Sequence, residues 1–328
     1  MDHSRLSGVL PGHEVRAASF DDVPAITAHI GRVTTALLGY PDASEADVRD
    51  DLTGLRFDIT RDTVVAVRAD GDVVVYAQGF DENDDSAWMD VYVDPRLEAT
   101  RFEAVADATV ATCLEQIRSS VAARGGSGTQ VKAGIYQQES QMRAAYERAG
   151  LSVDALYWRM AVELTPDADY TFSLPAPVQI RRVDPDDDGV LRVALSLQNQ
   201  AFSEHHGSSQ MSFDDFRAYW RGTEKYDPEA WWFAHRDGEP VGMLLGDNSR
   251  GDATVGYVRS LGVLKPARGQ GIAKALLLNA FDDYRRRGRT ALQLGVDSNN
   301  ATGATRLYEG LGMKAVISTL SMTRELAV

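Results

Sequence analysis

The sequence predicts an α/β protein that contains two copies of one fold in tandem. Its 328 residues suit about two domains. The stretch 145–151 reads Ala-Tyr-Glu-Arg-Ala-Gly-Leu, and 307–313 reads Leu-Tyr-Glu-Gly-Leu-Gly-Met. The two stretches lie roughly 160 residues apart, as expected for duplication of a whole domain. In the second half, strand-like and helix-like segments alternate around a glycine-containing turn, which favours an α/β fold.

The openings of the two halves also resemble each other. Residues 14–24 and 178–188 both read as a first strand followed by an aspartate-rich helix start. Between the halves, residues 165–177 contain three prolines and few periodic apolar positions, as linkers do. We therefore expect domains at 1–168 and 178–328, joined by a linker at 169–177.

The most informative stretch is 263–273, which reads Val-Leu-Lys-Pro-Ala-Arg-Gly-Gln-Gly-Ile-Ala. It follows a strand-like run at 254–263 and precedes a segment with helical spacing of apolar residues. Gly269 and Gly271 remove side chains where the backbone must approach a ligand, and the start of a helix favours an anion. The stretch therefore predicts a phosphate-binding turn. A nucleotide P-loop is excluded because no Gly-Lys-Ser/Thr follows, and a dinucleotide fingerprint is incomplete at Lys274.

A second strand is predicted at 290–297, and a short helix within 298–313 that ends at Gly310 or Gly312. The order of strand, R-G-x-G-x-A loop, helix, strand, asparagine, helix with Leu-Tyr-Glu and then Leu-Gly-Met resembles the GNAT acyltransferase superfamily over about 254–316. The resemblance implies that each copy has a mixed, mostly antiparallel central sheet with splayed strands, flanked by helices.

The resemblance also implies an acetyl-CoA site in the second copy. The loop would wrap the pyrophosphate, and the preceding strand end would pair its main chain with the pantetheine arm. Asn299 is an alternative to Asn300, because the spacing from Asn300 to Tyr308 is one residue longer than usual. The expected cofactor-binding residues are Leu261, Gly262, Val263, Arg268, Gly269, Gln270, Gly271, Ile272, Ala273, Asn300 and Tyr308.

Acyl transfer from a thioester to an amine needs a polarised carbonyl, a base and an acid. A backbone N–H near Val263 would polarise the carbonyl. The resemblance gives Tyr308 the role of acid for the leaving thiolate, whereas without it Tyr308 reads as a core tyrosine. No Asp or Glu lies in 254–263, so this strand supplies no carboxylate base. It offers Tyr257 as a catalytic candidate, on the face that alternation shares with Leu261 and Val263.

Other candidates for the acceptor side remain open. Arg259, on the same predicted face, would bind a substrate carboxylate or form a salt bridge with one of the many acids. Glu204 and His205 could accept a proton and His206 could bind an amine, or the histidines form a surface pair at a helix end. Aromatic residues could line an acceptor pocket or pack the first helices on the sheet; these are Tyr219, Trp220, Trp231 and Trp232.

The first copy lacks the glycine loop. Its equivalent segment at 94–103 has no glycine, and Glu98 and Glu103 would oppose a pyrophosphate. We expect this copy to bind acetyl-CoA poorly or not at all, to keep Tyr146 as a packing residue and to serve as a scaffold. Tandem GNAT proteins with one degenerate half, mycothiol synthases among them, are similar in this arrangement.

Bulk properties exclude several classes of protein. The net charge of −14 argues against a nucleic-acid groove. The single cysteine, Cys113, excludes intrachain disulfides and a zinc cysteine cluster, and the six scattered histidines favour no metal site. No apolar segment starts the chain and no run suits a membrane span, so we expect neither signal peptide nor membrane contact and a cytoplasmic location.

The sequence thus predicts an enzyme, a GNAT-type N-acetyltransferase that uses acetyl-CoA. Its partner would be a small-molecule or peptide amine, and the chain would be a monomer or a homodimer. The alternative is a non-catalytic acyl-CoA-binding or sensor protein, which the missing strand carboxylate would suit. The acceptor and the general base are not identified by the sequence.

Overall fold

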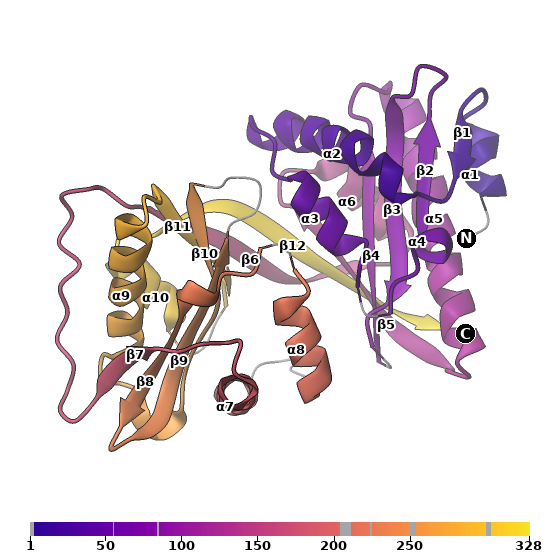
Figure 1. The fold of residues 1–328 in the computed structure, drawn as a ribbon. Helices are drawn as coiled ribbons and strands as arrows, with labels where there is room; N and C mark the ends of the chain where they lie inside the picture. The colour runs from indigo at the N-terminus through magenta and orange to yellow at the C-terminus, as the bar shows by residue number, and fades with distance from the viewer. Residues whose placement is uncertain are drawn as a thin grey trace. The chain divides into compact units, whose positions relative to one another are not determined.

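The computed structural model describes residues 3–54, 56–83, 85–203, 211–223, 225–248, 254–299 and 303–328. The chain divides into two compact units, which we call unit 1 and unit 2 (Figure 1). Unit 1 comprises Met1–Tyr157, Asp297–Asn299 and Ile317–Val328, and unit 2 comprises Trp158–Val296 and Asn300–Val316. In the described part of the chain, no helix is both long enough and apolar enough to span a membrane.

Unit 1 contains a mixed sheet with strand order β1-β2-β3-β4-β5-β12, in which only β4 and β5 are parallel. One core packs this sheet against α1, α5 and α6, and a second packs it against α2 and α3. The elements are β1 (Glu14–Arg16), β2 (Thr63–Val67), β3 (Val73–Asp81), β4 (Ser86–Val93), β5 (Gly128–Tyr136), β12 (Lys314–Ala327), α1 (Ser4–Val9), α2 (Val23–Leu38), α3 (Glu45–Asp51), α4 (Ile59–Asp62), α5 (Ala99–Ala123) and α6 (Ser140–Arg148).

Unit 2 repeats this plan with strand order β6-β11-β10-β9-β8-β7, and β10 and β11 are its parallel pair. One core contains residues of α9 and α10, and another contains residues of α7 and α8. The elements are β6 (Ser152–Glu163), β7 (Gln179–Arg182), β8 (Trp231–Arg236), β9 (Glu239–Asn248), β10 (Val255–Val263), β11 (Ala291–Asp297), α7 (Asp188–Ala201), α8 (Phe213–Arg221), α9 (Ile272–Arg286) and α10 (Ala304–Gly310).

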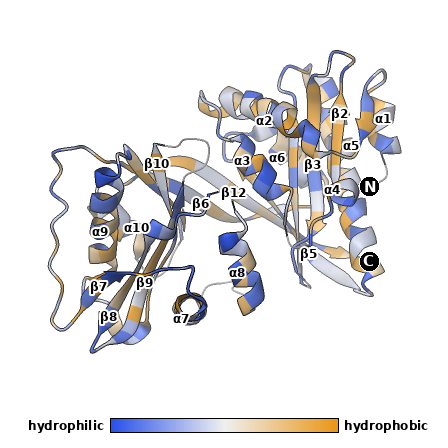
Figure 2. Ribbon diagram, in the orientation of Figure 1, coloured by the Kyte–Doolittle hydropathy of each residue, from blue (hydrophilic) through white to orange (hydrophobic). Residues whose placement is uncertain are grey.

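The sequence explains why these segments cover a sheet. Strand β2 is buried at all five positions, consistent with its run of Thr, Val and Ala between two helical layers. Hydrophobic and hydrophilic residues alternate along α9 in Figure 2, as they do in a helix that places one face on a sheet. The expected fold of a mixed, mostly antiparallel sheet flanked by helices is confirmed for both units.

The unit boundaries fall within β6 and β12, and most of β12 and the second half of β6 each join the sheet of the opposite half of the chain. Strand β12 pairs antiparallel with β5, from Thr319↔Tyr136 to Ala327↔Gly128. Strand β6 runs beside β11, where the N–H of Leu164 donates to the carbonyl of Thr290 over 2.7 Å. The units therefore differ from the expected ranges 1–168 and 178–328, because a sequence repeat does not reveal which copy of a duplicated strand completes each sheet. The expected linker lies in a segment without helix or strand.

Substitution in β12 should consequently destabilise unit 1. The Met322 side chain is fully buried in the core that α5 and β5 share, so Met322→Ala should cost about 2–5 kcal/mol there. Hydrogen exchange should accelerate in α5 and β5 and stay unchanged in α9 and β11. The neighbouring, partly exposed Thr323 gives a control, since Thr323→Ala should have little effect. Faster exchange confined to α9 and β11 would contradict the strand assignment.

Candidate functional site

The site lies where two neighbouring parallel strands of unit 2 separate. Strands β10 and β11 pair from Val255↔Ala291 only as far as Val258↔Leu294. Beyond this point β10 stays paired with β9 up to Val263, so its other edge is open. The pairing with β9 shifts register between Val258 and Ser260, which makes Arg259 the extra residue of a β-bulge.

The bulge changes which side chains share a face. Leu261 and Val263 pack with Val258 against the core that contains α9. Arg259 instead lies over the rings of Tyr219 and Trp220 from α8, on the opposite face. The prediction that Arg259 shares a face with Leu261 and Val263 is therefore wrong, because an extra residue reverses the alternation.

Main-chain groups of β10 face the opening. The N–H of Leu264 donates to the carbonyl of Val241 on β9 over 2.9 Å. Because the directions of main-chain groups alternate along a strand, Leu261 and Val263 turn theirs away from β9. The carbonyl of Val263 accepts a hydrogen bond from Arg268 Nε over 3.0 Å, which agrees with this direction.

The loop after β10 leaves open space before a helix. Gly269 and Gly271 have φ of 75° and 79°, in the left-handed region that favours glycine. A Cβ at either position would meet no heavy atom within 4 Å. Helix α9 begins directly afterwards at Ile272, so its first N–H groups and its dipole point toward this space. The arrangement suits a bound anion.

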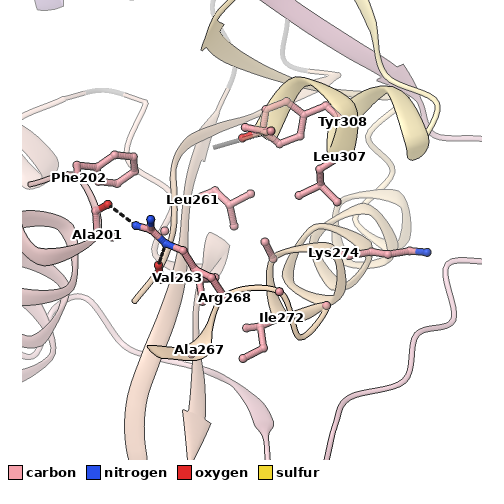
Figure 3. A pocket seen from close by; sticks show the side chains of 16 residues that line it. Ala201, Phe202, Leu261, Val263, Ala267, Arg268, Ile272, Lys274, Leu307 and Tyr308 are labelled. Carbon is pink, nitrogen blue, oxygen red and sulfur yellow. Dashed lines mark hydrogen bonds between the residues drawn. The ribbon is translucent and has the colours of Figure 1, made fainter. Parts of the chain in front are cut away.

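A cavity of about 290 Å³ connects the loop with the opening beside β10 (Figure 3). Figure 3 shows Leu261 between the loop, at one end, and Tyr308 of α10 at the other. The lining residues are Ala201, Phe202, Leu261, Gly262, Val263, Ala267, Arg268, Gly269, Gly271, Ile272, Ala273, Lys274, Gly303, Ala304, Leu307 and Tyr308.

Tyr308 brings a protonated hydroxyl to the cavity. The residue is 7% exposed, and burial raises the pKa of its hydroxyl to about 12. In Figure 3 this hydroxyl points toward the side of the cavity that Leu261 and Phe202 line. The tyrosine is therefore neutral at pH 7 and can donate a proton to a group in the cavity.

Comparisons with known proteins assign the family. The model of the acetyltransferase (GNAT) family matches residues 194–313, which include the bulge, the loop and Tyr308. A solved structure of a GCN5-related N-acetyltransferase from Sphaerobacter thermophilus is 27% identical, with a TM-score of 0.80 and 97% of each chain covered. Residues 194–313 thus form a domain of the GNAT acetyltransferase family.

Other relatives agree with a tandem GNAT arrangement. A tandem GNAT protein from the clavulanic acid biosynthesis pathway shares the fold, with a TM-score of 0.71, 15% identity and coverage of 96% of this chain and 99% of that one. The mycothiol acetyltransferase of Thermobispora bispora is 30% identical over 203 residues, or 60% of this chain and 66% of the relative. That of Beutenbergia cavernae is 36% identical over 124 residues, or 37% and 40%. The matches thus span less than two thirds of these curated relatives.

Most residues expected at the GNAT cofactor site line the cavity, with two exceptions. The side chain of Gln270 accepts a hydrogen bond from Arg236 over 2.6 Å and is not part of the lining. Asn300 lies outside the described residues, as do Glu204, His205 and His206. Gly262 has a packing role, because a Cβ there would lie 2.9 Å from that of Ala201.

Sequence reasoning missed several lining residues. Ala201 and Phe202 come from the end of α7, far from the loop in sequence, and no local pattern marks them. Lys274 stands in the first turn of α9, three residues after Gly271, and its spacing from the loop is the signal that could have indicated it.

Arg259 is held in an ion pair beneath the bulge. Its Nε donates to Asp247 Oδ2 over 2.5 Å and its Nη1 donates to Tyr219 Oη over 2.8 Å. Burial opposes the charge, but Tyr219 and Asp247 outweigh it, and the pKa of Arg259 is raised. Because the Asp247 charge offsets that of Arg259, the contacts favour the salt-bridge alternative over recognition of a substrate carboxylate.

Tyr257 lies beside the opening, on the face opposite Val258. Its hydroxyl is 3.0 Å from the position that a Cβ on Gly295 would occupy, just past the last parallel pair with β11. The absence of a side chain at Gly295 thus accommodates the tyrosine. The expectation that Tyr257 shares the face of Leu261 is wrong for the same reason as for Arg259.

The four aromatic residues that could have lined an acceptor pocket differ in their exposure to solvent. Trp220, Trp231 and Trp232 are buried in the cores of unit 2, as the packing alternative predicts. Tyr219 is 45% exposed and contacts Arg259.

In unit 1, the positions that correspond to the glycine loop and to Tyr308 have other contacts. Helix α5 begins at Ala99 without a preceding glycine, and the loop before it is fixed by Asp94, which accepts from Arg96 over 2.6 Å. Tyr146 is 1% exposed and packs in the core that α5, α6 and β4 share. Tyr146 is thus a packing residue, as expected, and the role of unit 1 as a scaffold stays a prediction.

Removal of the cation beneath the bulge should destabilise unit 2. Arg259→Met leaves the Asp247 carboxylate, which is 1% exposed, without its arginine partner and should cost about 3 kcal/mol in urea unfolding. Arg286 provides a control, because its pair with Asp282 is exposed and Arg286→Met should cost less than about 0.5 kcal/mol. Equal losses in the two variants would show that burial of the pair is unimportant.

Proposed function

We propose that the chain is an acetyl-CoA-dependent N-acetyltransferase. It transfers the acetyl group directly to the amine of a small molecule or peptide, and its active site is the cavity of unit 2. The observation that carries this proposal is the continuous path from the glycine loop, along the open edge of β10, to Tyr308. Along this path we assign an anion site to the loop end of the cavity and a proton donor to the end at Tyr308.

The loop fits the diphosphate of the donor. The space in front of Gly269 and Gly271 admits a ligand that any side chain there would displace, and the start of α9 supplies N–H groups. The open edge of β10 fits the amide groups of the pantetheine arm, because Leu261 and Val263 direct main-chain groups into the cavity. A main-chain N–H at this edge would polarise the acyl carbonyl.

Tyr308 would complete the transfer. The amine attacks the thioester carbonyl and forms the C–N bond, the C–S bond breaks, and Tyr308 donates its proton to the leaving thiolate. The raised pKa keeps the proton on the hydroxyl until that moment. The proton released by the amine leaves through a water or a side chain, and Tyr257 is our candidate on β10 because it lies beside the opening. Glu204, His205 and His206 are further candidates that only the sequence suggests.

The name of the curated relatives indicates which acceptors to test first. They are called mycothiol acetyltransferases, so amine precursors of mycothiol lead a panel that also contains amino acids, polyamines and peptides. Release of free thiol from acetyl-CoA with one acceptor would support the proposal. The alternative, a non-catalytic acyl-CoA-binding protein, is favoured by the absence of Asp and Glu from 254–263. It predicts tight binding of acetyl-CoA without turnover on any amine.

Gly271→Ala should abolish stabilisation by acetyl-CoA. The new Cβ enters the space before α9, and the left-handed backbone costs about 1–2 kcal/mol. A ligand at 100 times its Kd should stabilise the natural chain by about 2.7 kcal/mol, seen as a thermal shift. Gly238→Ala is the matched control, because its φ is 86°, its Cβ would also meet nothing within 4 Å, and it lies in the β8–β9 hairpin. The proposal fails if both variants respond equally to acetyl-CoA.

Tyr308→Phe should lower kcat about 100-fold or more while changing KM for acetyl-CoA little, because it removes only the proton donor. Its counterpart Tyr146→Phe should leave kcat unchanged. Since burial raises the pKa of Tyr308, the proton stays on as pH passes the usual value of about 10. The kcat profile of the natural chain should therefore show no alkaline decline from Tyr308 between pH 7 and about 10. A decline in this range that Tyr308→Phe removes would contradict the raised pKa of Tyr308, whereas an unchanged kcat in Tyr308→Phe would contradict its role as the acid.

A further inference from the structure

The side chain of Arg268 is turned away from the glycine loop that it precedes. Its Nε donates to the carbonyl of Val263 and its Nη2 donates to the carbonyl of Ala201, each over 3.0 Å. Figure 3 shows the guanidinium between the end of α7 and the end of β10, with both hydrogen bonds drawn. Arg268 thus connects the two elements that border one side of the cavity.

These contacts have a clear physical basis. The last four carbonyls of a helix lack partners within the helix, and a cation is stabilising at that end. Helix α7 has no basic residue in its last turn, so Arg268 supplies the cation from another segment. The planar guanidinium has several donors in fixed directions, which lets it bond two carbonyls at once. A lysine has a single ammonium on a flexible stem and cannot reproduce this geometry.

A second cation lies at the cavity without such contacts. Lys274 is exposed in the first turn of α9 and lines the cavity. Among the residues that the structure describes, no carboxylate forms an ion pair with it. In Figure 3 its side chain points away from Leu261, with the ammonium at the end farther from the cavity. It is therefore available to a charged group that extends out of the cavity past the helix start.

We propose that the two cations have separate roles in binding the donor. Arg268 is a positioning residue that fixes the end of β10 against α7 and so aligns the strand edge for the pantetheine portion. Lys274 is the residue that contacts phosphate groups of the coenzyme. This division rests on the proposed acetyl-CoA site and assigns the ligand charge to a residue outside the R-x-x-G-x-A pattern.

Two ligands separate these roles, because pantetheine has the arm of CoA without its phosphates. Calorimetry should show that Arg268→Ala weakens CoA and pantetheine by the same factor, about tenfold for two lost hydrogen bonds. Lys274→Gln should weaken CoA about five- to tenfold and leave pantetheine unchanged. The dependence of CoA binding on salt should decrease in Lys274→Gln and persist in Arg268→Ala.

Arg268→Lys provides the decisive conservative variant. A positioning role requires both carbonyl bonds, so Arg268→Lys should bind CoA as weakly as Arg268→Ala. A role as a phosphate contact would let the lysine restore CoA binding, and this result would overturn the proposal. So would a loss in Arg268→Ala that affects CoA and spares pantetheine. Thermal unfolding without ligand should show that each variant remains folded.

The same titrations distinguish failure of this inference from failure of the proposed function. If the natural chain binds neither CoA nor acetyl-CoA, the site itself is wrongly assigned. The natural chain could instead bind CoA and lose this binding in Gly271→Ala, while Arg268→Ala weakens CoA alone and Lys274→Gln weakens neither ligand. In that case the site is correctly assigned, and only the roles of Arg268 and Lys274 are wrong.

Discussion

The site in unit 2 depends on the early end of hydrogen bonding between β10 and β11. Four residue pairs join these strands, and after them β10 continues alone beside β9. The bulge at Arg259 accompanies this change, and the ion pair with Asp247 holds the bulged residue on the α8 side. Because the main-chain groups of Leu261 and Val263 then lack a strand partner, a ligand with amide groups can take its place. The cavity thus lies where one edge of β10 has no neighbouring strand.

The loop and the opening complement each other chemically. At one end, Gly269 and Gly271 expose the start of α9, where N–H groups and the helix dipole favour negative charge. At the other end, Tyr308 keeps its proton because its surroundings are apolar. A donor that is anionic at one end and carries a thioester at the other therefore meets appropriate groups along its whole length. Unit 1 also has a parallel strand pair that ends early, but no glycine precedes its helix α5, Asp94 accepts a hydrogen bond from Arg96 in the loop before that helix, and Tyr146 is buried in the core.

Sequence reasoning found the features whose signals lie close together in the chain and missed those that depend on contacts between distant segments. The glycine loop, the start of α9 and Tyr308 were predicted because their signals lie within one continuous segment. The face of Arg259 was predicted wrongly because the prediction assumed regular alternation of side chains along the strand. The bulge at this position has no signal in the local sequence. Ala201 and Phe202 escaped notice because only tertiary packing brings α7 to β10, where Gly262 permits close approach. The exchange of β6 and β12 also escaped, since either copy of a repeated strand satisfies the same pattern.

The exchanged strands have a consequence for how this protein evolves. Each half of the gene encodes the closing strand of the other half's sheet, so neither half specifies a complete fold by itself. Selection that preserves the sheet of one half therefore also preserves the strand that the other half contributes to it. Deletion of either half would leave the remaining sheet without its last strand.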